Sequence, residues 1–252
     1  MLHSDCLKGR HALVTGGGTG IGLSIAEALL AHGASVTITG RRGEVLTQVS
    51  AGRMNTQVMD VTDADSVQAA TDAAVANCGP IQIMVSNAGI AEGESFKRTS
   101  LDHWNRTMNT NLTGAFLSIQ AAMQSMAKTD WGRVIGVSSI AGVRGLKGAT
   151  AYTASKHGLV GLIHGLSAEY LGGNLTFNAL CPAYVDTEIV SRNVQGIASR
   201  TGMSAQDALG TMISQNRHNK LIHPDEVGAA AAWLCLPGSD AINGQTIEMA
   251  GG

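Results

Sequence analysis

A tyrosine and a lysine, Tyr152 and Lys156, stand four residues apart in the sequence. On a helix this spacing places both side chains on one face, within reach of each other. A free phenol has a pKa of about 10 and is a poor base at neutral pH, but a neighbouring ammonium lowers that pKa. Such a phenol can accept the proton of an alcohol as hydride leaves, or protonate a carbonyl oxygen during reduction. The pair indicates acid–base chemistry, although an exposed Tyr–Lys pair would show the same spacing.

Two more polar positions could serve this chemistry. Ser139 lies 13 residues before Tyr152, at the end of a predicted strand, where its hydroxyl can orient a substrate oxygen. Ser138 and Ser139 could equally cap the strand end, because small hydroxyl residues are common there. Asn111 places an amide inside an otherwise apolar helical segment.

A glycine-rich segment at residues 15–22 lies between a predicted strand and a predicted helix. Glycine lets the backbone approach a phosphate, and the amino end of the helix presents free N–H groups and a positive dipole. The spacing of Gly16, Gly20 and Gly22 differs from G-x-G-x-x-G, and no Lys-Ser/Thr pair follows as in a P-loop. A tight structural turn would use the same residues. After the first strand of an alternating chain, the segment predicts the pyrophosphate site of a dinucleotide.

The end of the second predicted strand is where the adenosine ribose of such a dinucleotide would lie. An acidic residue there would bind the ribose hydroxyls and repel a 2′-phosphate. The sequence instead has Arg41 and Arg42, and guanidinium groups pair with phosphate through a planar fork. NADP(H) is therefore favoured as the cofactor. NAD(H) stays open, because the arginines could also form a solvated turn or stack on adenine.

Two further segments close predicted strands. Asp60 and Val61 end the third strand and could contact the adenine, although Thr62 or Asp63 next to them could instead cap the following helix. Residues 86–89, Ser-Asn-Ala-Gly, end the fourth strand beside the expected cofactor, and a plain turn would use the same residue types.

Short β-branched segments alternate with longer helical patterns along the chain. The predicted strands cover residues 11–15, 35–39, 57–61, 81–86, 133–138, 175–181 and 245–248. The predicted helices cover residues 23–32, 63–77, 101–127, 152–171 and 225–234. This alternation predicts an α/β fold, a single Rossmann-like, doubly wound parallel sheet of about seven strands flanked by helices. Ligands of such a sheet bind beyond the carboxyl ends of its strands.

The stretch 185–221 interrupts the alternation. It is helical in pieces, for example at 205–213, and it is inserted between a strand and the last helix. It is therefore predicted to overhang the strand ends as a helical substrate lid. No linker or repeat divides the chain, so residues 1–252 are expected to form one dinucleotide-binding catalytic domain that includes this lid.

The composition excludes several classes of protein. The 252 residues are 44% hydrophobic and 14% charged, with a formal net charge of −2. No basic run could follow a nucleic-acid backbone, and no apolar stretch approaches the roughly 18–20 residues of a membrane helix. The amino end lacks the pattern of a secretory signal, so a soluble, cytoplasmic protein is expected.

Metal and hydrolase chemistry are not indicated. The four cysteines form no C-x-x-C pair, and the eight histidines show no H-E-x-x-H spacing. His157 and His164 share a helix face, but at ~1.5 Å rise per residue they lie about 10 Å apart, too far to hold one ion. Residues 136–140, Gly-Val-Ser-Ser-Ile, fail the G-x-S-x-G pattern of a serine hydrolase.

Over essentially its whole length, the chain resembles the compact branch of the short-chain dehydrogenases/reductases. The matching features, in order, are residues 15–22, Asp60, residues 86–89, Asn111, Ser139, Tyr152, Lys156 and residues 182–187. The resemblance implies that Tyr152 is the acid/base and that Ser139 polarises the substrate carbonyl. It implies that Lys156 binds the nicotinamide ribose and lowers the pKa of Tyr152. Asn111 would hold a water that links Lys156 to bulk solvent.

The resemblance also implies the cofactor contacts, with Val185 and Thr187 near the nicotinamide carboxamide. The predicted set is Gly16, Thr19, Gly20, Ile21, Gly22, Arg41, Asp60, Val61, Asn87, Ala88, Gly89, Tyr152, Lys156, Pro182, Val185 and Thr187. The sequence departs from the family pattern at Ser86, at Ala183 and at Thr19, where many NADP-preferring members carry a basic residue. None of these departures touches the Ser, Tyr, Lys and Asn set.

Together these features predict an NAD(P)-dependent oxidoreductase that interconverts a ketone and a secondary alcohol. Reduction of a 3-oxoacyl-type or bulky carbonyl compound with NADPH is favoured, and Arg144 and Lys147 could attract the phosphate of a thioester carrier or be solvated loop charges. The alternatives are an NAD-dependent dehydrogenase of hydroxyacyl-type alcohols and a non-catalytic NAD(P)-sensing protein. The resemblance implies a homotetramer or homodimer, in which Gly158, Gly161 and Gly165 would permit close helix approach.

Overall fold

The structure, a computed structural model, describes residues 5–251. Its seven strands form one sheet in the order β3-β2-β1-β4-β5-β6-β7, and every neighbouring pair is parallel. The strands are β1 (His11–Thr15), β2 (Ser35–Gly40), β3 (Asn55–Val58), β4 (Ile81–Ser86), β5 (Gly132–Val137), β6 (Leu175–Pro182) and β7 (Thr246–Met249). The order reverses between β1 and β4, which confirms the predicted doubly wound sheet.

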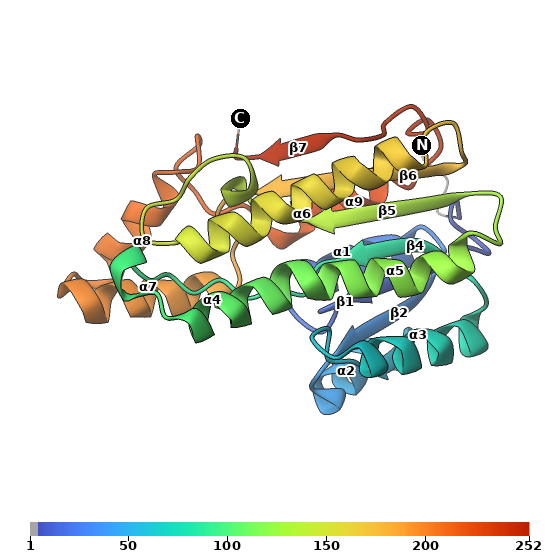
Figure 1. The fold of residues 1–252 in the computed structure, drawn as a ribbon, viewed down its shortest axis with the longest axis horizontal. Helices are drawn as coiled ribbons and strands as arrows, with labels where there is room; N and C mark the ends of the chain where they lie inside the picture. Colours follow the sequence, from blue (N-terminus) through green and yellow to red (C-terminus); the bar gives the residue numbers. More distant parts are fainter. Residues whose placement is uncertain (1–4, 252) are drawn as a thin grey trace.

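Helices cover both faces of the sheet (Figure 1). They are α1 (Gly20–Ala31), α2 (Gly43–Ser50), α3 (Ala64–Cys78), α4 (Leu101–Met108), α5 (Gly114–Met126), α6 (Thr150–Glu169), α7 (Glu188–Thr201), α8 (Ala205–Ile213) and α9 (Pro224–Trp233). Three short turns, η1 (Phe96–Arg98), η2 (Asn109–Thr113) and η3 (Ile140–Gly142), complete the helical segments of the described residues. Figure 1 shows α3, α5 and α6 in front of the sheet, with α1 and α9 behind it.

The core lies on both faces of the sheet because successive strand residues point to opposite sides. Val14 of β1 packs in one buried cluster with Ile25 of α1 and Val227 of α9. Leu13, its neighbour, packs in the other cluster with Ile119 of α5 and Ile163 of α6. A sheet covered on both faces explains why its central strands are apolar throughout rather than alternating.

The third strand is displaced from its predicted position. It covers Asn55–Val58 and not 57–61, so Asp60 and Val61 lie in the connection that follows it. Pairing with β2 ends at Val58, after which the Asp60 carboxylate accepts hydrogen bonds from the amide and hydroxyl of Thr62, at 2.9 and 2.8 Å. Asp63 then caps α3, accepting from the amides of residues 65 and 66. The end of β3 is therefore set by local polar contacts. A pattern of apolar residues does not reveal such contacts.

The long helix predicted at 101–127 is three segments. α4 and α5 are separated by the π-helical turn η2, which holds Asn111. A π-turn inserts one extra residue per turn and is often found at functional sites. Helix α2 was not predicted, since its eight residues are too few to show a clear period. Within the segment predicted as a lid, α8 covers the expected 205–213 and α7 precedes it.

A histidine lies buried in the sheet among polar partners. His11 of β1 is 2% exposed; its Nδ1 lies 2.7 Å from the Gly79 carbonyl and its Nε2 lies 2.8 Å from Thr37 Oγ1. The carbonyl requires an N–H on Nδ1, so Nε2 accepts from Thr37, which in turn accepts from Asn55 Nδ2 at 3.1 Å. Burial lowers the pKa of His11, because the charged form loses hydration, and the Gly79 contact opposes this only in part.

We predict that acid destabilises the protein partly through His11. A folded-state pKa below the ordinary value of 6.5 means that the unfolded chain binds the proton first, so the free energy of unfolding falls as pH drops below 6.5. Urea unfolding between pH 7.5 and 5 measures this decline. His11→Gln, which cannot be protonated, should show a shallower decline than the wild type. An identical slope for both proteins would contradict the role given to His11.

Candidate active site

The glycine loop after β1 leaves room for a ligand where side chains would intrude. Gly16 and Gly20 have φ values of +64° and +52°, a left-handed conformation that favours glycine. A Cβ on Gly22 would collide with the Gly16 carbonyl and the Asn87 side chain. Helix α1 begins at Gly20, and the side chain of its N-cap, Thr19, makes no capping hydrogen bond. The first amides of α1 therefore face the loop as donors, which fits a pyrophosphate.

The segment after β4 is fixed against this loop. The Asn87 amide and the Ala88 amide donate to Thr15 Oγ1 at 3.0 and 3.1 Å, and Asn87 Nδ2 donates to the Thr15 carbonyl at 2.9 Å. A Cβ on Gly89 would lie 3.1 Å from Asn111 Oδ1 and 3.5 Å from Lys156 Nζ. The predicted residues 87–89 thus connect the glycine loop to the candidate catalytic groups.

The end of β2 lies beside the same loop, since the Gly17 amide donates to the Thr39 carbonyl at 3.0 Å. Arg41 and Arg42 follow this strand and are exposed. Hydrogen bonds from the amide and hydroxyl of Thr62 lower the pKa of Asp60, and the nearby charge of Arg41 lowers it further. Arg41 and Asp60 therefore lie close together at the edge where an adenosine ribose would bind.

Val61 and Ala88, two predicted cofactor contacts, belong to one apolar cluster with Met59. Val61 also packs against α5, where a Cβ on Gly114 would lie 2.8 Å from its Cγ2. Ile21 packs against the core on the other face of the sheet, so it supports the glycine loop from behind.

The predicted catalytic groups meet at the carboxyl ends of β5 and β6. Lys156 Nζ lies 5.9 Å from the centre of the Tyr152 ring, so both side chains project from one face of α6. Tyr152 makes a hydrogen bond with the side chain of Ser139, whose Oγ also accepts from the Ala141 amide at 3.1 Å. Lys156 Nζ donates to the Val137 carbonyl at 2.9 Å. Ser139, Tyr152 and Lys156 thus form one group, in which Ser139 and Lys156 are buried and Tyr152 is half-buried.

Electrostatics in this group differ from the expectation that Lys156 lowers the pKa of Tyr152. Burial raises the pKa of the Tyr152 phenol, and the hydrogen bond with Ser139 opposes this rise. Burial lowers the pKa of Lys156 to about 8, because the ammonium loses hydration. For both Tyr152 and Lys156, the loss of hydration shifts the pKa more than the electrostatic attraction between the two side chains that their spacing suggested. Tyr152 is therefore a protonated phenol at neutral pH in this structure.

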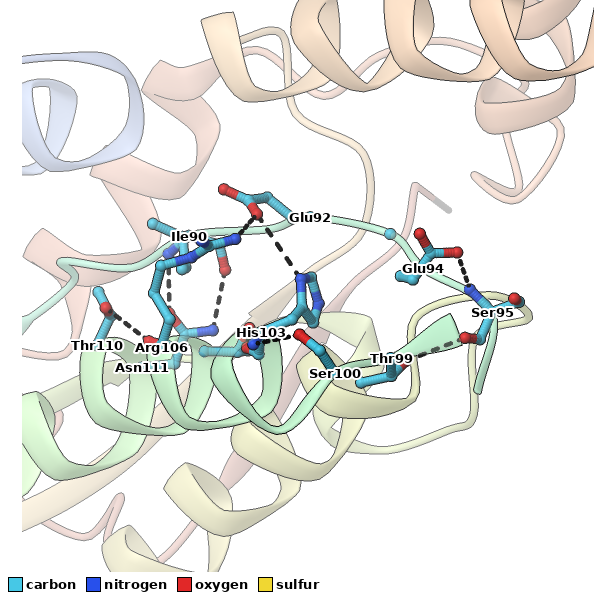
Figure 2. A network of polar contacts seen from close by, with 12 residues as sticks. Ile90, Glu92, Glu94, Ser95, Thr99, Ser100, His103, Arg106, Thr110 and Asn111 are labelled. Carbon is cyan, nitrogen blue, oxygen red and sulfur yellow. Dashed lines mark hydrogen bonds and ion pairs between the residues drawn. The ribbon is translucent and has the colours of Figure 1, made fainter. Parts of the chain in front are cut away.

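Asn111 is buried in the π-turn and makes three side-chain hydrogen bonds, two of them with Ile90 (Figure 2). Its Oδ1 accepts from the Ile90 amide at 2.8 Å, and its Nδ2 donates to the Ile90 carbonyl at 2.9 Å. Nδ2 also donates at 3.0 Å to Ser155 Oγ, which donates to the Tyr152 carbonyl at 2.8 Å. Asn111 thereby joins the segment after β4 to the helix that carries Tyr152 and Lys156.

Figure 2 shows that the segment after β4 is attached a second time, at Glu92, two residues after Ile90. Glu92 accepts from Arg106 Nη2 of α4 at 2.5 Å, and its carboxylate lies 3.9 Å from His103 Nδ1. Next to it, the Gly93 carbonyl accepts from Arg200 Nη1 of α7 at 2.9 Å. Glu92 and Ser155 were not predicted as site residues, because neither belongs to a periodic or spaced pattern.

The loop after β6 leads from the candidate catalytic groups to the segment predicted as a lid. Pro182 pairs with Met249 as the last residue of β6, and Val185 is buried in a bridge with Ile222. Thr187 is the N-cap of α7, and its Cγ2 would lie 3.1 Å from a Cβ on Gly20. The start of α7 therefore approaches the glycine loop, as expected for residues that border one cofactor.

No metal cluster accompanies these residues. Among residues 5–251, no group of three or more His, Cys, Asp or Glu side chains could hold a metal ion. His157 Nδ1 contacts the Thr153 carbonyl at 3.0 Å and His164 Nε2 contacts Thr246 Oγ1 at 2.8 Å. In the same described part of the chain, no helix is long and apolar enough to cross a membrane.

The chain is similar over nearly its whole length to known dehydrogenases and reductases. A D-beta-hydroxybutyrate dehydrogenase of Cupriavidus necator is 31% identical over 253 residues, covering 98% of each chain. A 3-oxoacyl-(acyl-carrier-protein) reductase of Vibrio harveyi is 32% identical over 249 residues, again with 98% of each chain covered. A solved polyketide ketoreductase of the actinorhodin pathway, a variant with NADPH, has a TM-score of 0.92 and 29% identity, covering 100% of this chain and 98% of its own.

The family model described as short chain dehydrogenase matches residues 10–197. This match covers most of the sheet and the residues that the sequence analysis singled out between Gly16 and Thr187. Relatives above 30% identity over nearly the full length include both a dehydrogenase and a reductase. The chain belongs to the short-chain dehydrogenase family and is an oxidoreductase that interconverts carbonyl and alcohol groups with a nicotinamide dinucleotide.

Proposed function

We propose that the protein reduces a 3-oxoacyl-type or bulky ketone to a secondary alcohol with NADPH, using Tyr152 as the proton donor. One observation carries this proposal: the half-buried Tyr152 phenol is hydrogen-bonded to Ser139 and lies one helical turn from Lys156, at the carboxyl edge of the sheet. Its raised pKa favours the neutral phenol. A phenol held in its neutral form suits proton donation to a carbonyl oxygen. NADPH, when bound, supplies the hydride that reduces the carbonyl carbon.

Ser139 orients the carbonyl oxygen in this proposal. Its Oγ already accepts from the Ala141 amide, so its O–H is the part left to donate. A substrate oxygen placed between Ser139 and Tyr152 would receive one hydrogen bond from each hydroxyl. Preorganised donors of this kind stabilise the negative charge that develops on the oxygen.

Lys156 and Asn111 would return the proton to Tyr152. With a pKa of about 8, Lys156 can gain and lose a proton near neutral pH more easily than an exposed lysine. A Cβ on Gly89 would lie 3.1 Å from Asn111 Oδ1 and 3.5 Å from Lys156 Nζ, so the two side chains approach each other beside Gly89. A water held at Asn111 would link Lys156 to bulk solvent. Lys156 would also bind the nicotinamide ribose.

The residues around the glycine loop fit a dinucleotide. The amides at the start of α1, together with Gly16, Thr19, Gly20, Ile21 and Gly22, would hold the pyrophosphate. Arg41, Asp60 and Val61 would hold the adenosine end, and Asn87, Ala88, Gly89, Pro182, Val185 and Thr187 would border the nicotinamide end. Arg41 favours the 2′-phosphate of NADP(H), and the polyketide ketoreductase relative, solved with NADPH, supports this choice.

Residues 185–221, with α7 and α8, would act as a lid on the single catalytic domain. The Arg200 hydrogen bond to Gly93 joins this segment to the loop after β4, across the candidate site. The apolar cluster of Val190, Val194, Ala208 and Met212 holds α7 against α8. A lid of this kind excludes water and encloses the substrate.

One alternative activity, oxidation of an alcohol, is also supported by a relative. The D-beta-hydroxybutyrate dehydrogenase of Cupriavidus necator favours an NAD-dependent oxidation of a hydroxyacyl-type alcohol. The two 3-oxoacyl-type and polyketide reductase relatives, together with Arg41, support reduction with NADPH. A non-catalytic NAD(P)-sensing role is less consistent with a complete set of Ser139, Tyr152, Lys156 and Asn111.

Self-association stays a prediction, as does a cytoplasmic location. Gly158 packs within the chain, since a Cβ there would lie 2.6 Å from Leu112 Cδ2. Gly161 and Gly165 of the same helix have no atom within 4 Å of such a Cβ, so this part of α6 is open to a second copy. A homodimer or homotetramer packed through α5 and α6 would cover it.

We predict that Tyr152→Phe reduces kcat by at least about 100-fold, the usual contribution of a general acid. NADPH binding, followed by fluorescence titration, should change less than about threefold, because the phenol does not hold the phosphates. Tyr170→Phe is the matched control, since Tyr170 lies on the surface at the end of α6. Full turnover by Tyr152→Phe with any ketone that the wild type reduces would exclude Tyr152 as the proton donor.

We predict that Arg41→Gln weakens NADPH binding about 10- to 100-fold, as expected for loss of a hydrogen bond between charged groups. NADH binding should stay within about twofold, because NADH lacks the 2′-phosphate. Paired titrations of both nucleotides measure the difference, with Arg42→Gln as the neighbouring control. Equal losses for NADPH and NADH in Arg41→Gln would refute 2′-phosphate recognition by Arg41.

A further inference from the structure

Tyr184 occupies a fixed position just after β6. Its amide donates to Asn216 Oδ1 at 3.0 Å, and its carbonyl accepts from Asn216 Nδ2 at 2.9 Å. Asn216 is fully buried and donates to the Lys220 carbonyl as well, at 2.6 Å. This reciprocal pairing locks the Tyr184 backbone to the segment after α8. Its ring is half-buried.

Arg144 reaches the same corner from the loop that follows Ser139. Its Nη2 donates to the carbonyl of Gln215, the residue before Asn216, at 3.4 Å. The guanidinium is otherwise exposed, and within residues 5–251 no carboxylate forms an ion pair with it. Arg144 and Tyr184 are therefore brought together by one contact region, Gln215 and Asn216.

The electrostatic couplings agree with this geometry. Burial raises the pKa of Tyr184, and the positive charge of Arg144 opposes that rise. Tyr184 in turn adds to the rise in the pKa of Tyr152. Arg144 thus acts on Tyr184, and Tyr184 acts on Tyr152, the proposed proton donor. The Tyr184 hydroxyl has no hydrogen-bond partner among the described residues, and in the same part of the chain the exposed Arg144 guanidinium donates only to the Gln215 carbonyl. Both side chains can therefore still donate to a ligand.

We propose that Tyr184 and Arg144 form a subsite for an oxyanion on the substrate, close to the carbonyl that is reduced. This proposal rests on the proposed reduction and specifies its substrate class. Guanidinium and phenol groups are matched donors for carboxylate or phosphate oxygens. In a 3-oxo acid the carboxylate is two bonds from the reacting carbon, and in a carrier thioester the phosphates lie further out. Both sources offer the same chemistry to Arg144.

Steady-state kinetics of Arg144→Gln test the subsite, with NADPH and three probes: acetoacetate, acetoacetyl-coenzyme A and ethyl acetoacetate. We expect KM to rise about 10-fold or more for at least one anionic probe, with kcat within about twofold. The neutral ester should show less than a twofold change in KM. A rise for acetoacetate identifies a carboxylate subsite, and a rise only for the coenzyme A thioester identifies a phosphate subsite.

Three further variants separate recognition from structural damage. Arg144→Lys keeps the charge and should recover part of the lost affinity for the anionic probe. Tyr184→Phe removes only the unpaired hydroxyl and should raise the same KM at least about threefold. Arg192→Gln is the matched control, because within residues 5–251 this exposed arginine of α7 makes its one hydrogen bond to the Glu188 carbonyl of its own helix.

The experiment distinguishes a failure of the subsite from a failure of the proposed reduction. If the wild type reduces the probes but Arg144→Gln changes KM equally for anionic and neutral ones, the subsite is refuted and the proposed reduction stands. If the wild type reduces no carbonyl compound in the presence of NADPH, the proposed reduction itself fails, and the subsite with it.

Discussion

Two hydrogen bonds between β5 and α6 determine where the reactive side chains of this protein lie. Lys156 Nζ donates to the Val137 carbonyl, and Ser138 Oγ donates to the Lys156 carbonyl at 3.0 Å. The helix is therefore held at one axial position along the strand. Gly142 packs so closely over this contact that a Cβ would collide with Ser138 Oγ. Because Tyr152 is carried on the same helix, its distance from Ser139 depends on this fit.

The topology of the sheet supplies the second constraint. The strand order reverses between β1 and β4, so the connections that follow these two strands diverge to opposite faces and leave a crevice. Thr15 spans that crevice at its base by accepting from the amides of Asn87 and Ala88. The glycine loop and the polar groups of β5 and β6 thus open onto one edge, although they come from distant parts of the sequence.

Most of the fold was predictable because a sheet covered on both faces needs continuous apolar strands. The strands His11–Thr15 and Ile81–Ser86 match their predicted bounds for this reason. The third strand did not, since the Asp60–Thr62 hydrogen bonds, and not apolar residues, end it. The π-turn at Asn111 was hidden inside a helical pattern, because a single extra residue does not change hydrophobic periodicity over such a length. The grouping of Ser139, Tyr152 and Lys156 followed from spacing, whereas the contacts of Glu92, Tyr184 and Asn216 depend on tertiary packing.

The segment that carries α7 and α8 is attached unequally at its two sides. The buried Asn216 side chain fastens one side through three part-buried hydrogen bonds, and an exposed hydrogen bond from Arg200 to the Gly93 carbonyl joins the other side to the loop after β4. The side at Asn216 is therefore held more firmly than the side at Arg200. Opening of this segment would break the Arg200 contact before those of Asn216, so Tyr184 would keep its place while a small molecule enters.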